Sequence, residues 1–77
     1  MKVIEKQKEW KISRELEFEE FFEVAMLIDK LNYIPGIIEP IEIKTTVAKQ
    51  NRAIFDVTSY NEHDCQLVEE FFTDNNY

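Results

Sequence analysis

Residues 10–31 read WKISRELEFEEFFEVAMLIDKL, and the hydrophobic period changes within this stretch. Apolar and polar residues alternate over residues 9–18, which is the period of a half-buried β-strand. The apolar side of that strand holds Trp10, Ile12, Leu16 and Phe18. Arg14 falls in the same inward register, so it needs an ionic partner or a place at the sheet margin. We expect Glu42 or Asp56 to pair with it, and an anion-binding guanidinium is the functional alternative.

From Glu19 the apolar residues recur at helical spacing. At 100° per residue, the side expected to face the core holds Phe21, Val24, Ala25, Ile28 and Leu31. Acidic residues in the first turn suit the amino terminus of a helix. Pro35-Gly36 then predicts that the helix ends near residues 32–34.

The rest of the chain adds two strands and one helix. Alternation predicts strands over 41–48 and 53–60, joined by a four-residue hairpin loop at 49–52. A helix is expected over 62–73, with Asn61 as its N-cap and Asp64 in a capping-box-like position. Residues 2–6 indicate a further short strand or lead-in.

The resulting order is β-α-β-β-α, which predicts the α+β class. We expect one domain over residues 1–77, built as a two-layer sandwich. Its antiparallel sheet would carry both helices on one face.

The 77 residues carry a net charge of −7, arranged in blocks. Residues 15–29 contain six acids and no base, and residues 54–77 contain six further acids. This balance disfavours direct binding to a nucleic acid backbone. It favours a protein partner with a basic or mixed surface, chiefly through faster encounter.

The residue types needed for catalysis or metal binding are scarce. Cys65 and His63 are each the only one of their kind, so we expect no disulfide within the chain, no metal site and no cofactor. His63-Asp64-Cys65 contains the types of a catalytic triad, but neighbours on a helix point 100° apart and cannot meet. We expect an exposed histidine, a capping aspartate, a half-buried cysteine and no catalytic residues.

No apolar run approaches the roughly 18 residues needed to span a membrane. The first residues also lack an apolar segment of signal-peptide length. A free cysteine and no export signal indicate a cytoplasmic protein.

The candidate partner-binding residues of the first helix are Phe22, Met26 and Tyr33, with Asp29 alongside. They lie together on the helical wheel, well away from the expected core stripe. A helix packed on one sheet needs one apolar stripe, so a second stripe indicates a second contact, with a target protein or a homodimer mate. The alternative is that the second helix or the 35–40 loop covers these residues.

The acidic run is a second candidate surface, made of Glu15, Glu17, Glu19, Glu20 and Glu23. Carboxylates at phosphate-like spacing would suit an inhibitor that mimics nucleic acid. The alternative is a solvated strand edge and helix face without a function of its own.

One family resemblance carries a different implication. The pattern Ile12-x-Arg14-x-Leu16-x-Phe18-x-x-Phe21 resembles the strand-into-helix segment of the pterin-4a-carbinolamine dehydratase family. Residues 51–59, followed by Asp64-x-x-Leu67, resemble the later strand and final helix of that family, so the likeness spans about two-thirds of the chain. The family has two catalytic histidines before a proline, where this chain reads Asn32-Tyr33-Ile34-Pro35. The resemblance therefore implies a related fold whose dehydratase chemistry is lost.

Three functions follow as hypotheses. We favour a small, acidic, non-enzymatic interaction protein, a regulator or inhibitor of the kind that phages and mobile elements encode. It would act as a homodimer on a larger protein, without contacting nucleic acid or membrane. The alternatives are a pterin-dehydratase-like enzyme or ligand binder, with a pocket formed by Tyr33, His63 and Arg14, and a nucleic-acid-mimicking inhibitor.

Overall fold

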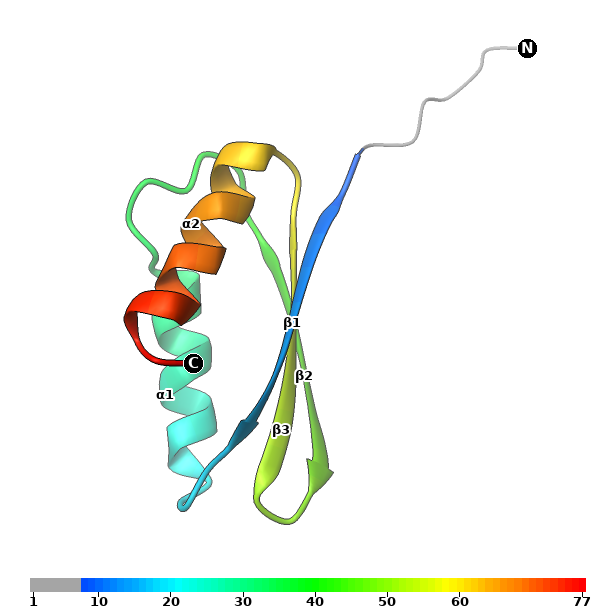
Figure 1. Cartoon of the computed structure of the whole chain (residues 1–77), viewed down its shortest axis with the longest axis vertical. Coiled ribbons are helices and arrows are strands. Elements are labelled where there is room, and N and C mark those ends of the chain that lie inside the picture. Colours follow the sequence, from blue (N-terminus) through cyan, green and yellow to red (C-terminus); the bar gives the residue numbers. More distant parts are fainter. Residues whose placement is uncertain (1–7) are drawn as a thin grey trace, which may run out of the picture.

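The computed structural model describes residues 8–77, and the strand or lead-in expected at residues 2–6 lies outside them. The elements are β1 (Trp10–Glu17), α1 (Phe22–Asn32), β2 (Glu42–Lys49), β3 (Arg52–Ser59) and α2 (Glu62–Asp74). This order confirms the predicted β-α-β-β-α chain and the α+β class (Figure 1).

The three strands form one antiparallel sheet in the order β1-β3-β2. Val57 in the central strand pairs with Ile12 of β1 and with Ile43 of β2. Side chains alternate between the two faces of a sheet, so every second residue of β3 points to the core. These core-facing residues are Ala53, Phe55, Val57 and Ser59, and all four are buried.

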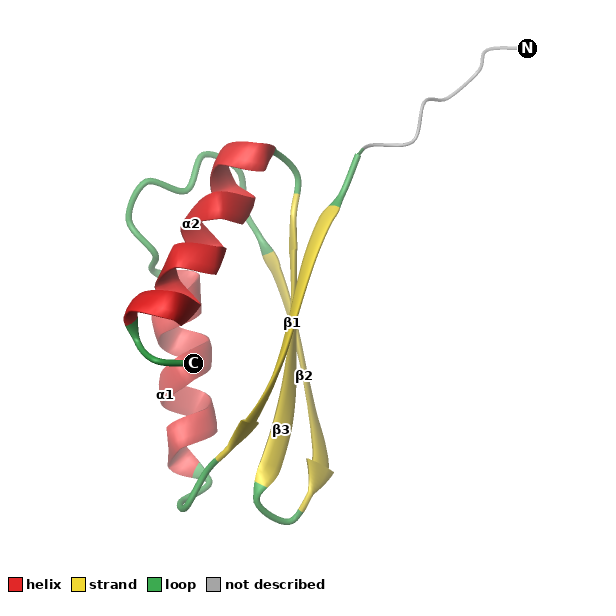
Figure 2. Ribbon diagram, viewed as in Figure 1, coloured by secondary structure: helices red, strands yellow, loops and turns green. Residues whose placement is uncertain are grey.

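Both helices lie to the same side of the sheet in Figure 2, and the hydrophobic core fills the space between the two layers. Val24, Leu27 and Leu31 enter this core from α1, and Val68 and Phe72 enter it from α2. The opposite face of the sheet carries mainly polar residues, such as Lys11, Glu42 and Thr58 in one cross-strand row.

The core stripe of α1 is rotated from the one the sequence predicted. Leu27 is buried, whereas Phe21 and Ala25, which we placed in the stripe, are exposed. Helix α1 begins at Phe22 rather than at Glu19, and the preceding residues form a turn. The apolar arc of the helix is wider than the surface it can bury, so the position of the sheet decides which part is covered.

The β2–β3 hairpin is tighter than expected. Lys49 pairs with Arg52, which leaves a two-residue turn at Gln50 and Asn51 in place of the predicted four-residue loop. The register shifts between Val47 and Lys49. Ala48 is the extra residue of this β-bulge and has no partner in β3. The Asn51 carbonyl also accepts a hydrogen bond from the Phe18 N–H (2.9 Å), which joins the turn to the end of β1.

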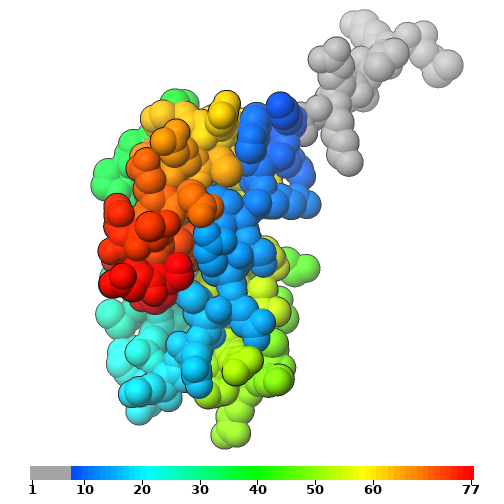
Figure 3. Space-filling view, in the orientation of Figure 1, coloured from blue at the N-terminus to red at the C-terminus, as the bar shows by residue number. Residues whose placement is uncertain are grey.

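Helix α2 ends in a Schellman motif. Asn76 has a φ of 61°, its N–H donates to the Thr73 carbonyl, and the Tyr77 N–H donates to the Phe72 carbonyl (2.7 Å). In Figure 3 these last residues, in red, pack close to β1, in blue, and above the cyan start of α1. Across residues 8–77, no helix combines the length and the hydrophobicity that crossing a membrane requires.

Candidate protein-binding surface

Helix α1 is held at its amino terminus by its own side chain. One carboxylate oxygen of Glu23 accepts hydrogen bonds from the backbone N–H groups of Glu19 and Glu20, each at 2.8 Å. Both N–H groups belong to the turn that precedes α1, so the carboxylate ties that turn to the first residues of the helix and also opposes the positive end of the helix dipole. At the other end the Tyr33 N–H donates to the Lys30 carbonyl, and the backbone leaves helical geometry.

The three side chains that the helical spacing set apart are exposed in the structure. Relative exposure is 61% for Phe22, 50% for Met26 and 77% for Tyr33. Neither α2 nor the 35–40 loop covers them. We call this surface the outer face of α1, because Phe22 and Met26 lie opposite the buried Val24, Leu27 and Leu31 on the helix.

Phe21 is a further exposed aromatic residue, which the helical spacing wrongly placed in the core. It is 65% exposed and meets Phe18 edge to face, with ring centroids 6.0 Å apart. Its helical-wheel position suggested the core, but the stripe that the sheet covers is centred on Val24, Leu27 and Leu31 and leaves this position outside. The double phenylalanine at residues 21 and 22 was the available signal, because successive helical residues point about 100° apart and cannot both lie at the centre of one stripe.

The five acidic residues of the second candidate surface are divided among different settings. Glu15 and Glu17 project from the face of β1 away from the helices, where Glu15 lies 3.7 Å from the Arg52 guanidinium and Glu17 accepts from the Asn51 amide. Glu19 and Glu20 stand in the turn before α1, and the Glu23 carboxylate is folded back onto that turn. The five carboxylates therefore lie on a strand, a turn and a helix, and they do not form one straight row.

Arg14 is inward-facing as predicted, but both expected partners were wrong. Its guanidinium binds the Glu69 carboxylate of α2 at 2.7 Å and lies over the Phe72 ring, 5.4 Å from the centroid. Asp56 instead accepts a hydrogen bond from the Ser13 hydroxyl on the opposite face. Arg14 therefore links the sheet to α2, which is a structural role.

Asp64 is a buried anchor rather than a simple helix cap. Asn61 is the N-cap, as predicted, and accepts from the Asp64 N–H (2.8 Å). The Asp64 carboxylate is fully buried and accepts from the N–H groups of Ile38 and Glu39 (2.9 Å each) and from the Asn61 amide. Burial raises the pKa of Asp64, but these hydrogen bonds and that of His63 outweigh it and hold the pKa at about 2.

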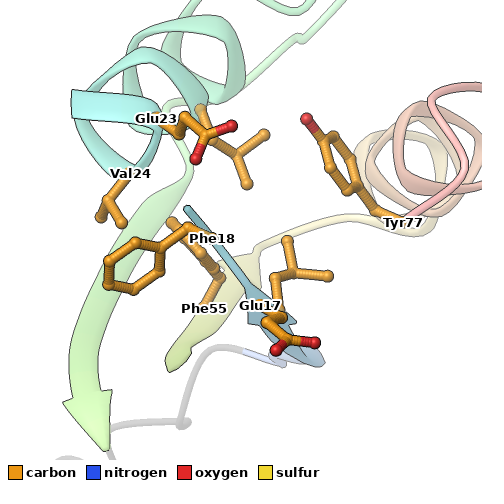
Figure 4. Close-up of a pocket in the computed structure, with 8 residues that line it drawn as sticks. Glu17, Phe18, Glu23, Val24, Phe55 and Tyr77 are labelled. Carbon is orange, nitrogen blue, oxygen red and sulfur yellow. The ribbon is translucent and has the colours of Figure 1, made fainter. Parts of the chain in front are cut away.

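A small cavity lies between the start of α1, the end of β1 and the last residue of the chain (Figure 4). It encloses about 60 Å³, and the Tyr77 ring points into it from the end of α2 while Phe55 and Val24 line the far side. Pockets for small-molecule ligands are typically about 300–1,000 Å³, so this cavity has room for a few water molecules only.

The residues required for a ligand pocket or a reactive centre are spread out. Tyr33, His63 and Arg14 do not line the cavity of Figure 4, and Arg14 is engaged by Glu69. His63 is exposed and lies 3.2 Å from the Asp64 carboxylate, and Cys65 is half-buried. Within residues 8–77, no three His, Cys, Asp or Glu side chains are grouped so that they could hold a metal ion.

Comparisons with protein-family models, curated proteins and solved structures returned no match to this chain. Inferences about function therefore rest on the surface itself. Its distinctive feature is a helix with one side in the core and a row of large apolar side chains on the other.

Proposed function

We propose that the chain is a non-enzymatic interaction protein of the cytoplasm, a regulator or inhibitor that binds a larger protein through the outer face of α1. The observation that carries this proposal is the exposure of Phe22, Met26 and Tyr33 on a well-anchored helix. Aromatic and methionine side chains are enriched at the centres of protein interfaces, where a few of them supply most of the binding energy.

The expected gain from covering this face is appreciable. Full burial of a Phe or Met side chain contributes about 1.5–3 kcal/mol, and these side chains are already partly covered, so each would add roughly 1–2 kcal/mol. The helix is already folded and anchored, which keeps the ordering cost on binding low. The net charge of −7 favours encounter with a basic or mixed partner surface.

The test is to remove the apolar face while keeping the fold. The double variant Phe22→Asp, Met26→Asp should lose association with the partner isolated by affinity capture, identified by mass spectrometry and then purified. Val47→Asp is the matched control, because Val47 is also an exposed apolar residue (46%) but lies on β2. Circular dichroism should show all three proteins folded. If the double variant binds the purified partner as tightly as the control does, the proposal is wrong.

The homodimer stays a prediction of the same proposal. Sedimentation velocity of the wild type at several concentrations measures it directly. A dimer that persists in the double variant would form elsewhere, for example along an edge strand, and would leave the outer face free for the larger partner.

A further inference from the structure

The outer face of α1 has the spacing of a helix–helix interface. Phe22, Met26, Asp29 and Tyr33 are separated by four, three and four residues, which is the alternation of seam positions in a coiled coil. The first three lie within α1 and Tyr33 caps it. The seam is therefore apolar at its two ends and carries one carboxylate, that of Asp29, in between.

Asp29 makes this face selective. It follows Met26 by three residues, so a partner that covers the methionine also covers the carboxylate. Removing a carboxylate from water without an ionic partner is strongly unfavourable, which would offset the gain from the apolar residues. A cationic side chain placed opposite Asp29 removes that penalty, and arginine suits it best because it can bind a carboxylate through two parallel hydrogen bonds.

The charged residues that precede and surround Asp29 in the chain are also mainly acidic. Glu19 and Glu20 are exposed directly before the helix, and residues 15–29 include no basic residue. Lys30 is the single base of α1. A second copy of the chain would bring acidic groups against acidic groups with one lysine per copy to compensate, so the charge pattern favours a different, basic partner.

From this pattern we propose that the occupant of the outer face is an amphipathic, basic α-helix of another protein. Its apolar residues follow the same three-and-four spacing, and an arginine or lysine lies opposite Asp29. Helix α1 has 11 residues and is about 16 Å long, so about three turns of the partner helix are in contact. This inference rests on the proposed function and names the class of partner.

A designed peptide serves as the probe. It is an 18-residue helix with leucine at the seam positions, one central seam arginine and lysines on its flanks. A scrambled peptide keeps the composition but loses the stripe, and a third peptide replaces the seam arginine with glutamate. Binding is measured by fluorescence anisotropy, and the site by the methyl signal of Met26, which is one of two methionines in the chain.

The arginine peptide should bind at least tenfold more tightly than the scrambled one and shift the Met26 methyl signal. Asp29→Arg should lower the affinity for the arginine peptide at least tenfold and restore binding of the glutamate peptide. Asp74→Arg makes the same charge reversal at the exposed end of α2 and should change affinity no more than about twofold.

Three results would overturn the inference: equal binding of the scrambled peptide, equal effects of the two reversals, or a wild-type dimer that Asp29→Arg dissolves. Any of these results leaves the proposed function standing if Phe22→Asp, Met26→Asp still abolishes binding of the purified larger partner. If that double variant also binds the purified partner as tightly as the wild type does, both the proposed function and the inference about the partner helix are wrong.

Discussion

Replacement of Asp64 by asparagine should destabilise the protein by about 2–3 kcal/mol. The carboxylate accepts backbone hydrogen bonds from Ile38 on one oxygen and from Glu39 on the other, and the Asn61 amide donates to the second oxygen. Asparagine keeps one acceptor, so its NH₂ group must face at least one of these donors. Losing a hydrogen bond to a charged group costs roughly 1.5–3 kcal/mol, and the donor left without a partner adds to this loss.

This loss is large for a chain of 77 residues, whose total stability is expected to be about 4–12 kcal/mol. Thermal unfolding followed by circular dichroism should show a midpoint lower by roughly 10–20 °C. Asp74→Asn is the control, because Asp74 is exposed at the other end of α2, and it should change stability by less than about 0.5 kcal/mol. A destabilisation of Asp64→Asn equal to that of the control would refute the role assigned to this carboxylate.

The pH dependence follows from the same contacts. The pKa of Asp64 is about 2 in the folded protein and 3.8 ordinarily, so the unfolded state binds more protons between these values. The stabilising contribution is fully present above about pH 5 and is lost as the pH falls through 3.8 towards 2. Urea unfolding of the wild type should therefore show a decline over this range that is clearly smaller in Asp64→Asn.

Three further changes have defined outcomes, each measured by urea unfolding at neutral pH. Gly36→Ala should destabilise by about 1–2 kcal/mol, because Gly36 has a φ of 89° and an added Cβ would lie 3.3 Å from Leu67. Glu23→Gln should cost about 1 kcal/mol through weaker hydrogen bonds to two backbone N–H groups of the turn before α1. Asn76→Gly should stabilise by up to about 1 kcal/mol, because glycine adopts the left-handed conformation (φ 61°) without a side-chain penalty.

Each of these changes has a result that would contradict its reasoning. Gly36→Ala as stable as the wild type would mean that the turn can adopt another conformation at no cost. If Glu23→Gln is as stable as the wild type, water must accept hydrogen bonds from the two N–H groups as well as the carboxylate does. A destabilised Asn76→Gly would show that the asparagine side chain contributes more than its backbone conformation costs.

Local periodicity accounts for what could be predicted. Alternation at residues 10–17 and helical spacing after residue 21 determine the type of each element, because side-chain direction repeats every two residues in a strand and every 3.6 in a helix. The same rule placed Phe22 and Met26 away from the core. The N-cap role of Asn61 was also predictable, because it depends on the backbone of the next three residues only.

Contacts between distant segments could not be read in this way. Arg14 binds Glu69, 55 positions away, whereas the partners proposed for it lie on the other two strands. Asp64 meets Ile38, 26 positions away, so its burial depends on how the 36–39 loop returns to α2. Several acidic side chains are candidate partners for each hydrogen-bond donor, and the local sequence pattern does not indicate which of them lies close in the folded chain.

The sequence by itself therefore determined the order and type of the elements, the acidic character and the presence of surplus apolar surface on the first helix. Only the tertiary structure decided that β3 lies at the centre of the sheet, that Leu27 rather than Phe21 is buried, and that Asp64 anchors the loop. The physical reason is that the apolar side of an amphipathic helix spans a wider arc than the sheet packed against it can cover. Which part of the arc is buried is settled when the two layers pack together.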